Sequence, residues 1–143
     1  MLGIEDAAHA EYDPNAPSPL IAPVSCPVAG RPDGAPKLSG KLTIRLDPDS
    51  LAFRIYRQEH IEEEFFCNYE LNPAFQAAIE AGRLRLVGLG ERGEARVAEL
   101  PGHPFFLAAL FLPQLSSSES APHPLIMAYL ETVLSFREAF QPT

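Results

Sequence analysis

The amino-acid sequence predicts a single domain of the α/β class, and three observations support this. Residues 41–46 place apolar side chains at every second position, which is typical of a half-buried strand. Residues 122–140 carry apolar side chains at helical spacing, which predicts a closing amphipathic helix. The near-continuous apolar run at residues 105–111 suits a strand covered on both faces, and we expect it to be the central strand. The length of 143 residues fits one domain.

The amino-terminal elements follow in chain order. Residues 1–36 are rich in proline, which lacks an amide donor, so we expect them to be largely irregular. The sheet and helices then occupy residues 37–143. Ser50 is placed to cap a short helix that runs to Tyr56. In residues 61–71 aromatic side chains gather towards the end, and this second half predicts another strand.

The middle of the chain gives clearer boundaries. Pro73 opens a helix whose apolar stripe stops at Gly82, as helix termini prefer. Residues 84–88 alternate as a strand. Gly93 can adopt the positive φ of a hairpin turn, and this turn leads to a further strand at residues 95–100.

Composition and charge exclude several classes of function. The formal net charge is -8 and the pI is about 4.9, which argues against binding to the phosphate backbone of nucleic acids. The apolar runs are too short for a membrane-spanning helix, so we expect no membrane partner. The amino terminus lacks the features of a secretory signal, which makes the cytoplasm the default location. The cysteine spacing fits neither a metal site nor a disulfide framework, and we expect no cofactor.

Four stretches of sequence, in order, resemble a known family. They are Leu2-Gly3-Ile4-Glu5-Asp6-Ala7 with Glu11-Tyr12-Asp13-Pro14, Tyr69-Glu70-Leu71-Asn72, Glu99-Leu100-Pro101-Gly102-His103-Pro104-Phe105-Phe106, and Pro122-His123-Pro124-Leu125. Together they resemble the carboxyl-terminal half of the glutaminase domain of CTP synthase, a class I glutamine amidotransferase. The chain looks most similar to stand-alone proteins described as related to the CTP synthase carboxyl-terminal region. The resemblance implies part of a flavodoxin-like three-layer domain, with a mixed sheet and flanking helices.

The resemblance also implies which groups the chain would need to hydrolyse glutamine. The reaction uses a thiolate on a Gly-x-Cys-x-Gly elbow, a histidine base and a carboxylate that orients the histidine. In the family the elbow lies amino-terminal to everything in this chain. The histidine and glutamate belong to a Phe-His-Pro-Glu sequence, where this chain has Phe111-Leu112-Pro113-Gln114. Leu112 cannot accept a proton and Gln114 cannot stabilise an imidazolium, so we expect no catalytic residues.

A second departure concerns ligand binding. The family has a basic stretch whose arginine would hold the glutamine carboxylate, and this chain has Glu64-Phe65-Phe66-Cys67-Asn68 there. Asn68 offers one neutral hydrogen bond, and Glu64 would repel the ligand. A residual pocket for glutamine or a nucleotide would use Asn68, Tyr69 and Cys67. We therefore expect a degenerate, non-catalytic binding or regulatory module. The alternatives are one piece of a CTP synthase-like enzyme that aminates UTP, or a small-molecule sensor with a pocket under residues 101–104.

Cys67 could serve as a replacement nucleophile with His60 or His103 as its base, but core packing is the simpler reading for both Cys67 and Cys26.

His9, Glu11 and Asp13 alternate and could converge on a metal ion, but residues in this setting more often face solvent or cap turns. We expect His103 and His123 to hydrogen-bond backbone. The acidic residues 62–64 read as a solvated face.

Half of such a domain would leave apolar surface uncovered. We expect the strand at residues 105–111 to have exposed apolar faces or an unpaired edge, which is an aggregation liability. Three explanations are open: the chain begins at an internal methionine of a longer protein, a second polypeptide segment covers the sheet, or the half-domain forms a homo-oligomer.

Overall fold

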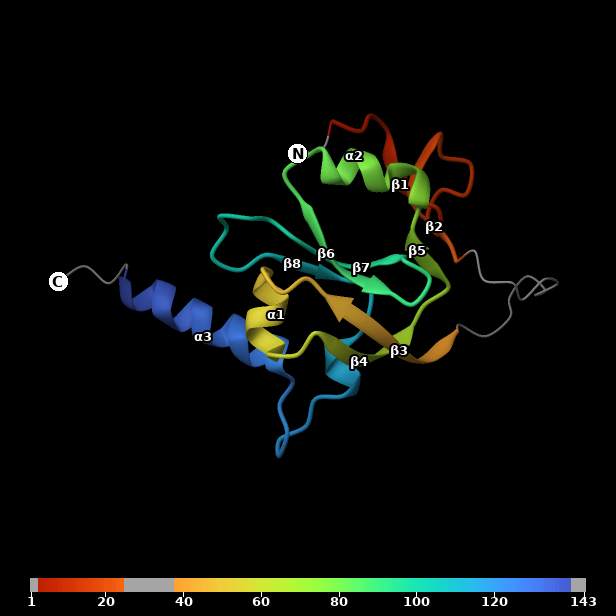
Figure 1. The fold of residues 1–143 in the computed structure, drawn as a ribbon. Coiled ribbons are helices and arrows are strands. Elements are labelled where there is room, and N and C mark those ends of the chain that lie inside the picture. The colour runs from red at the N-terminus through yellow and green to blue at the C-terminus, as the bar shows by residue number, and fades with distance from the viewer. Residues whose placement is uncertain (1–2, 25–37, 140–143) are drawn as a thin grey trace.

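The computed structural model describes residues 3–24 and 38–139, which form two β-sheets with helices against them (Figure 1). A five-stranded sheet has the strand order β4-β3-β6-β7-β8, and a three-stranded sheet has the order β1-β2-β5. In chain order the elements are β1 (Ala7–His9), β2 (Ser18–Pro23), β3 (Ser39–Leu46), α1 (Leu51–Tyr56), β4 (His60–Phe66), β5 (Tyr69–Leu71), a 3₁₀ turn (Pro73–Phe75), α2 (Gln76–Glu80), β6 (Arg85–Gly90), β7 (Ala95–Glu99), β8 (Leu107–Ala109), a second 3₁₀ turn (Pro113–Leu115) and α3 (Pro124–Ala139).

Local sequence explains the first half of the larger sheet. Ile44 and Leu46 of β3 are fully buried, as the period-two pattern predicted. The Ser50 hydroxyl accepts a hydrogen bond of 2.9 Å from the Phe53 amide and caps α1, which confirms the predicted cap. The helix ends at Arg57, which adopts a left-handed conformation with φ of 56°.

The two faces of the larger sheet build two separate apolar clusters. One face is covered by α1 and by the start of α3, and the other by α2 and the smaller sheet. The first cluster contains Ile44, Leu46, Ala52, Ile61, Val87, Val97, Phe111 and Leu125. The second is smaller, with Leu71, Ile79 and Ala95 as its buried members. The chain therefore has a full core on one face and a thin one on the other.

The apolar run at residues 105–111 is not the central strand. Only Leu107–Ala109 form β8, and β8 stands at one end of the strand order. The Leu110 amide still donates to the Arg96 carbonyl of β7, and the Phe111 side chain, which is 4% exposed, then lies in the core. β8 is the last strand in the order that the described residues form.

Residues 3–24 contain two strands, although the prolines of this segment predicted a largely irregular backbone. β1 and β2 lie within residues 3–24, and β2 pairs parallel to β1 and antiparallel to β5. This pairing joins residues about 50 positions apart in sequence, which local patterns do not reveal. Likewise the whole of His60–Phe66 is a strand, because it pairs along its length with β3. Cys26 lies outside the described residues.

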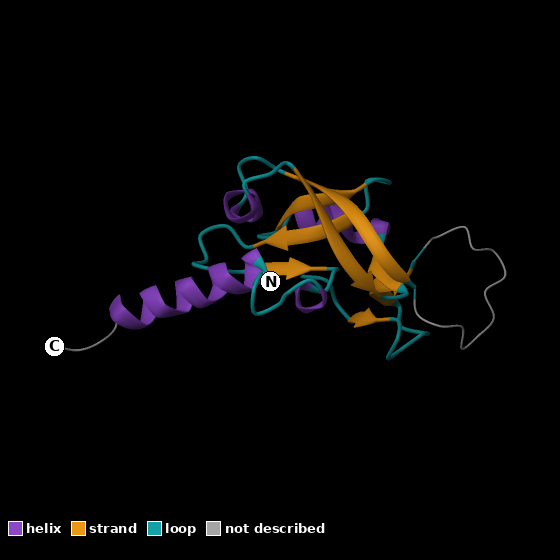
Figure 2. Ribbon diagram, turned by 90° about the horizontal axis from the view of Figure 1, so that it is seen from below, coloured by secondary structure: helices purple, strands orange, loops and turns teal. Residues whose placement is uncertain are grey.

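The closing helix forms as predicted, but it buries little. In α3 only Leu125 is buried, whereas Tyr129, Leu130, Val133 and Leu134 are each about half exposed. The helix projects from the body of the molecule in both ribbon views (Figures 1 and 2). Within the described residues, no helix is both long enough and apolar enough to traverse a lipid bilayer.

The α1 cap gives a direct test of the local interpretation. Ser50→Ala should lower the free energy of unfolding by about 1 kcal/mol, because the Phe53 amide loses its acceptor in a buried position. Urea unfolding followed by circular dichroism measures the change. Ser116→Ala, at an exposed position, is the matched control and should change stability by less than about 0.5 kcal/mol. Equal effects of the two substitutions would contradict the capping role.

Candidate functional site

The residues that follow β8 stand where the resemblance expects a histidine and a glutamate. Leu112 is half-buried, and its amide donates to the Glu64 carbonyl at 2.9 Å. Gln114 is exposed and belongs to the 3₁₀ turn Pro113–Leu115. This segment is therefore fixed against β4 by backbone contacts, and neither side chain can exchange a proton at neutral pH.

The expected residual pocket residues join β4 to β5. The Cys67 amide donates to the Leu38 carbonyl at 2.9 Å, and its sulfur accepts from the Tyr69 amide at 3.3 Å. The Asn68 side-chain oxygen accepts from the Leu38 amide at 2.8 Å, and the Asn68 carbonyl accepts from Val24 at 2.8 Å. These contacts hold the connection in place. A role of Asn68, Tyr69 and Cys67 in binding a ligand stays a prediction.

The alternating residues near the amino terminus hold their own turn. The His9 Nδ1 accepts from the Glu11 amide at 3.1 Å, and an Asp13 carboxylate oxygen accepts from Asn15 at 3.2 Å. The His9 ring lies 4.9 Å from the ring of Tyr69. Among the residues that the structure places, no three histidine, cysteine or acidic side chains gather as a metal site would require.

The proposed partners of Cys67 lie elsewhere. His60 and Cys67 flank the seven-residue strand β4 at opposite ends, roughly 20 Å apart at strand spacing. The Nδ1 of His103 accepts from the Phe105 amide at 3.2 Å, and its ring meets that of Phe106. In the described ranges, no imidazole hydrogen-bonds to the half-buried thiol of Cys67.

One buried polar cluster was not expected from the sequence. Glu63 was assigned to a solvated acidic face, yet it is only 3% exposed. The strand alternation explains this correction, because Glu62 points to solvent and pairs with Lys41 at 2.7 Å while Glu63 points inward with Ile61. The period-two pattern from Ile61 was the signal that could have revealed it.

Two donors satisfy the buried Glu63 carboxylate. The Tyr56 hydroxyl donates to Glu63 Oε1, and His123 Nε2 lies 2.9 Å from the same oxygen. Because His123 Nδ1 accepts from the Leu125 amide at 3.2 Å, the Nε2 atom is assigned the proton and donates to Glu63. Burial, the hydrogen bond to Glu63 and the charge of Glu63 together raise the pKa of Tyr56 well above its usual value.

A second group of charges lies on the other side of the sheet. Glu70 is 2% exposed and accepts from Arg92 at 2.9 Å, with Arg96 at 3.7 Å. Arg96 donates to Glu94 at 2.9 Å. Burial acts to raise the pKa of Glu94, but the hydrogen bonds from Arg96 and from backbone amides outweigh it, and the pKa is lowered.

The motif glutamate of β7 has a structural contact as well. Glu99 is 6% exposed, and its Oε2 accepts from the Leu51 amide at 2.7 Å at the start of α1. Its other oxygen lies 3.6 Å from Arg85. Glu70, Glu99 and His123 all belong to the stretches that carry the family resemblance, and all three are buried framework groups.

Comparison with known proteins shows which proteins have a similar sequence. No protein-family model matches this sequence. The CTP synthase of Syntrophus aciditrophicus is 34% identical over 139 residues, which are 96% of this chain and 26% of that enzyme. This chain is related to CTP synthase. The CTP synthase of Pelotomaculum thermopropionicum is 33% identical over 140 residues, again 26% of the enzyme. The chain thus spans about a quarter of the length of these CTP synthases.

A solved structure shares the fold of this chain. The Trypanosoma brucei CTP synthase glutaminase domain with bound acivicin aligns with a TM-score of 0.83 and 20% identity. The alignment covers 94% of this chain and 53% of that domain. The fold is therefore that of a class I glutamine amidotransferase domain, of which this CTP synthase-related chain spans part, as the sequence motifs predicted.

The buried cluster predicts a dependence on alkaline pH. The raised pKa keeps Tyr56 protonated in the folded protein, whereas an unfolded tyrosine ionises near pH 10. Its contribution to stability is therefore complete below about pH 10 and is lost as the pH rises beyond it. Tyr56→Phe should lower the free energy of unfolding by about 1.5–3 kcal/mol at pH 7 and weaken the alkaline decline.

Urea unfolding between pH 7 and pH 11 measures both effects. Tyr12→Phe is the control, because that side chain is 85% exposed and should leave the profile unchanged. An alkaline profile of Tyr56→Phe identical to that of the unsubstituted protein would refute this account of the cluster.

Proposed function

We propose that this chain is a degenerate glutamine amidotransferase-like module that binds or regulates and does not hydrolyse glutamine. The observation that carries the proposal is the pair Leu112 and Gln114, in the segment after β8 whose backbone is bonded to Glu64. Neither residue supplies the base or the orienting acid that a glutaminase thiol requires. We also propose that the module is cytoplasmic and has a role in pyrimidine nucleotide biosynthesis.

The division between retained and replaced residues supports this proposal. Glu70, Glu99 and His123 are buried and hydrogen-bonded, so they are needed for the fold whether or not the reaction occurs. Asn68 is engaged by the backbone of Leu38 and offers no charge to a ligand carboxylate. Framework groups are thus retained where reacting and clamping groups are replaced.

Glutamine hydrolysis is the first test. Purified protein incubated with glutamine should release no ammonia above the rate of a buffer blank, because no base activates a thiol. Cys67→Ser is assayed in parallel as the matched variant. Turnover that the chain shows and that Cys67→Ser abolishes would overturn the proposal.

Ligand binding is the second test. Glutamine, UTP and CTP are screened by thermal shift, since a ligand at 100 times its Kd stabilises the folded state by about 2.7 kcal/mol. We expect one of them to raise the melting temperature without any reaction. Cys67→Ala should reduce that shift if the segment from Cys67 to Tyr69 lines the pocket. No shift with any of the three compounds would contradict a binding role for that segment.

The alternative function is a part in glutamine-dependent amination of UTP within a longer assembly. The similarity to CTP synthases over 93–97% of the chain favours it. This alternative requires a further segment with a Gly-x-Cys-x-Gly elbow and a replacement for the base. An upstream or neighbouring reading frame that encodes such an elbow would support it.

A further inference from the structure

The imidazole of His123 is buried at 4% exposure, and both of its ring nitrogens are engaged. The Nε2 atom lies 2.9 Å and 3.2 Å from the two carboxylate oxygens of Glu63. The Nδ1 atom accepts from the Leu125 amide at 3.2 Å. A neutral imidazole satisfies both contacts, because it has one donor and one acceptor. The ring therefore links β4 to the first turn of α3.

The backbone of His123 fastens the same turn. Its carbonyl accepts from the Met127 amide at 3.1 Å, which is a helical bond of α3. Its amide donates to the Ser117 hydroxyl at 3.1 Å, in the loop before the helix. One residue thus holds the amino-terminal end of α3 through its side chain and through both of its backbone groups.

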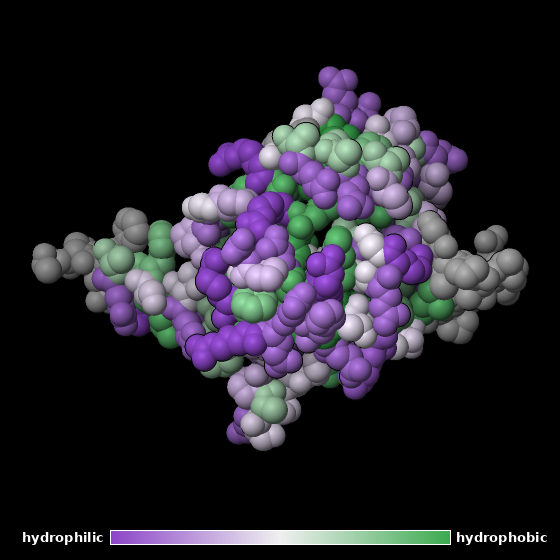
Figure 3. All heavy atoms as spheres, in the orientation of Figure 1, coloured by the Kyte–Doolittle hydropathy of each residue, from purple (hydrophilic) through white to green (hydrophobic). Residues whose placement is uncertain are grey.

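The rest of α3 makes few contacts that could replace this attachment. Leu125 is its buried side chain, the Tyr129 ring packs 5.5 Å from that of Phe105, and the helix also contacts α1. Hydrophobic residues remain visible where the helix projects (Figure 3). We call the 45–52% exposed residues Tyr129, Leu130, Val133 and Leu134 the α3 stripe. The direction of this 16-residue helix therefore depends on how its first turn is held.

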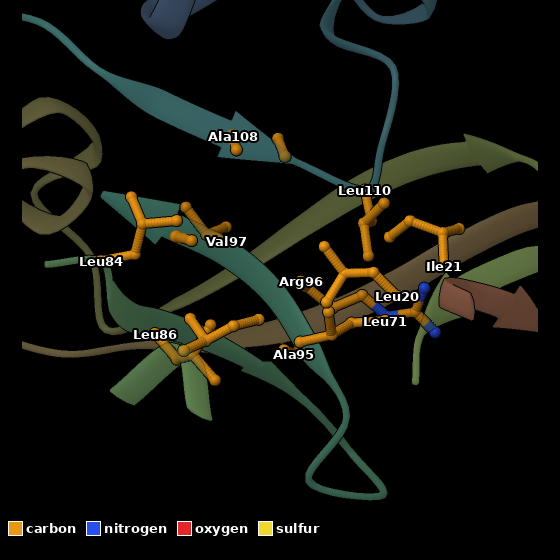
Figure 4. Close-up of a pocket in the computed structure, with 13 residues that line it drawn as sticks. Leu20, Ile21, Leu71, Leu84, Leu86, Ala95, Arg96, Val97, Ala108 and Leu110 are labelled. Carbon is orange, nitrogen blue, oxygen red and sulfur yellow. The ribbon is translucent and has the colours of Figure 1, made fainter. Parts of the chain in front are cut away.

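An apolar hollow lies beside the first turns of α3. It has a volume of about 240 Å³, and Leu125 and Tyr129 line it together with Leu107 of β8 and Pro113. Another apolar hollow, lined by Leu20 and residues of β6 and β7, has none of residues 124–139 in its lining (Figure 4). A movement of the first turn would therefore reshape the hollow next to Pro113.

Two titratable groups face His123 from other elements. The Tyr56 hydroxyl of α1 lies 3.4 Å from Nε2, and the Glu63 carboxylate of β4 lies 2.9 Å from the same atom. The preceding loop contributes the Ser117 hydroxyl, and α3 contributes the positive end of its backbone dipoles. The carboxylate favours a positively charged ring at this place, whereas the start of the helix disfavours it.

A second proton has one nitrogen of this ring to bind. Nε2 already carries a proton towards Glu63, so a proton taken up from solvent binds Nδ1. The ring then gains one positive charge and keeps its contact with Glu63 as an ion pair. It also presents an N–H group where the Leu125 amide needs an acceptor. Protonation therefore breaks the contact with α3 and preserves the contact with β4.

We propose that His123 is a pH-sensitive latch, which holds the first turn of α3 when its ring is neutral and releases it when the ring takes up a proton. Imidazole is the side chain whose charge changes between about pH 5 and pH 8, so acidification through this interval drives the release. The sheet stays folded because the ion pair with Glu63 remains. The latch goes beyond the proposed function and needs no ligand, so either proposal can fail without the other.

A second histidine offers a matched comparison within the chain. The Nδ1 atom of His103 accepts from the Phe105 amide at 3.2 Å, just as His123 accepts from the amide two residues ahead. Proline follows both histidines. His103 is exposed, however, and a loop follows it instead of a helix. The two sites share the local hydrogen bond and differ in burial and in what the bond holds.

Nuclear magnetic resonance of the full chain, labelled with ¹⁵N, tests the latch between pH 8 and pH 5. The ring nitrogens of His123 report where the second proton binds. Amide exchange, corrected for its intrinsic pH dependence, reports the first turn. Protection of the Leu125 and Met127 amides should fall about three- to tenfold, with the midpoint of the ring titration, because the turn loses one hydrogen bond. The Arg57 amide, bonded to the Phe53 carbonyl at the end of α1, should keep its protection.

Two substitutions separate the latch from a general effect of acid. His123→Asn keeps a side-chain acceptor for the Leu125 amide but cannot take up a proton, so protection of that amide should be equal at pH 8 and pH 5. His103→Asn is the matched control and should leave the Leu125 response unchanged. Circular dichroism checks that His123→Asn folds, since Glu63 loses a donor. The ring titration of the unsubstituted chain decides the question if it does not.

The possible outcomes are distinct. Loss of protection at Leu125 that follows the His123 ring, while Arg57 stays protected, supports the latch. Protection of Leu125 that does not follow the ring titration overturns it, as does a ring that takes up no second proton down to pH 5. Loss of protection at Arg57 over the same interval shows unfolding of the whole chain and also overturns it. A pH response that persists in a folded His123→Asn variant has the same consequence.

Discussion

The buried carboxylate of Glu63 is the constraint on which the arrangement of the helices depends. An ionised group at 3% exposure is costly unless donors compensate for the lost water. The two donors are Tyr56, the last residue of α1, and His123, which precedes α3. One carboxylate on β4 therefore joins the end of α1 to the residue that precedes α3.

The same principle applies to three buried residues of the family-like motifs. Glu70, Glu99 and His123 each have a partner in another element, so replacing one would leave a buried polar group unsatisfied. The side chains of Leu112 and Gln114, which follow β8, are not buried polar groups of this kind. Gln114 is exposed, and Leu112 contributes its backbone amide, which any residue except proline could provide.

The asymmetry of the sheet has a physical consequence for the chain's state in solution. One face holds a packed cluster, while the other face, the β8 edge and the α3 stripe leave apolar groups accessible. Soluble proteins rarely retain a contiguous surface of this kind without a use for it. Next to it, β8 is a terminal strand among the described residues, and an exposed strand edge is a template for pairing with another strand.

The sequence by itself determined the local elements and the relationship. The period-two pattern of β3, the Ser50 cap and the helical spacing of α3 depend on neighbouring residues, and four motifs in order indicated a class I amidotransferase fold. Only the tertiary structure decided that β8 is an edge, that β2 pairs with β5, and that Glu63 is buried. These features arise from contacts between residues far apart in the chain, which local patterns do not reveal. The apolar run at residues 105–111, for example, has the same sequence pattern whether one or both of its edges are paired.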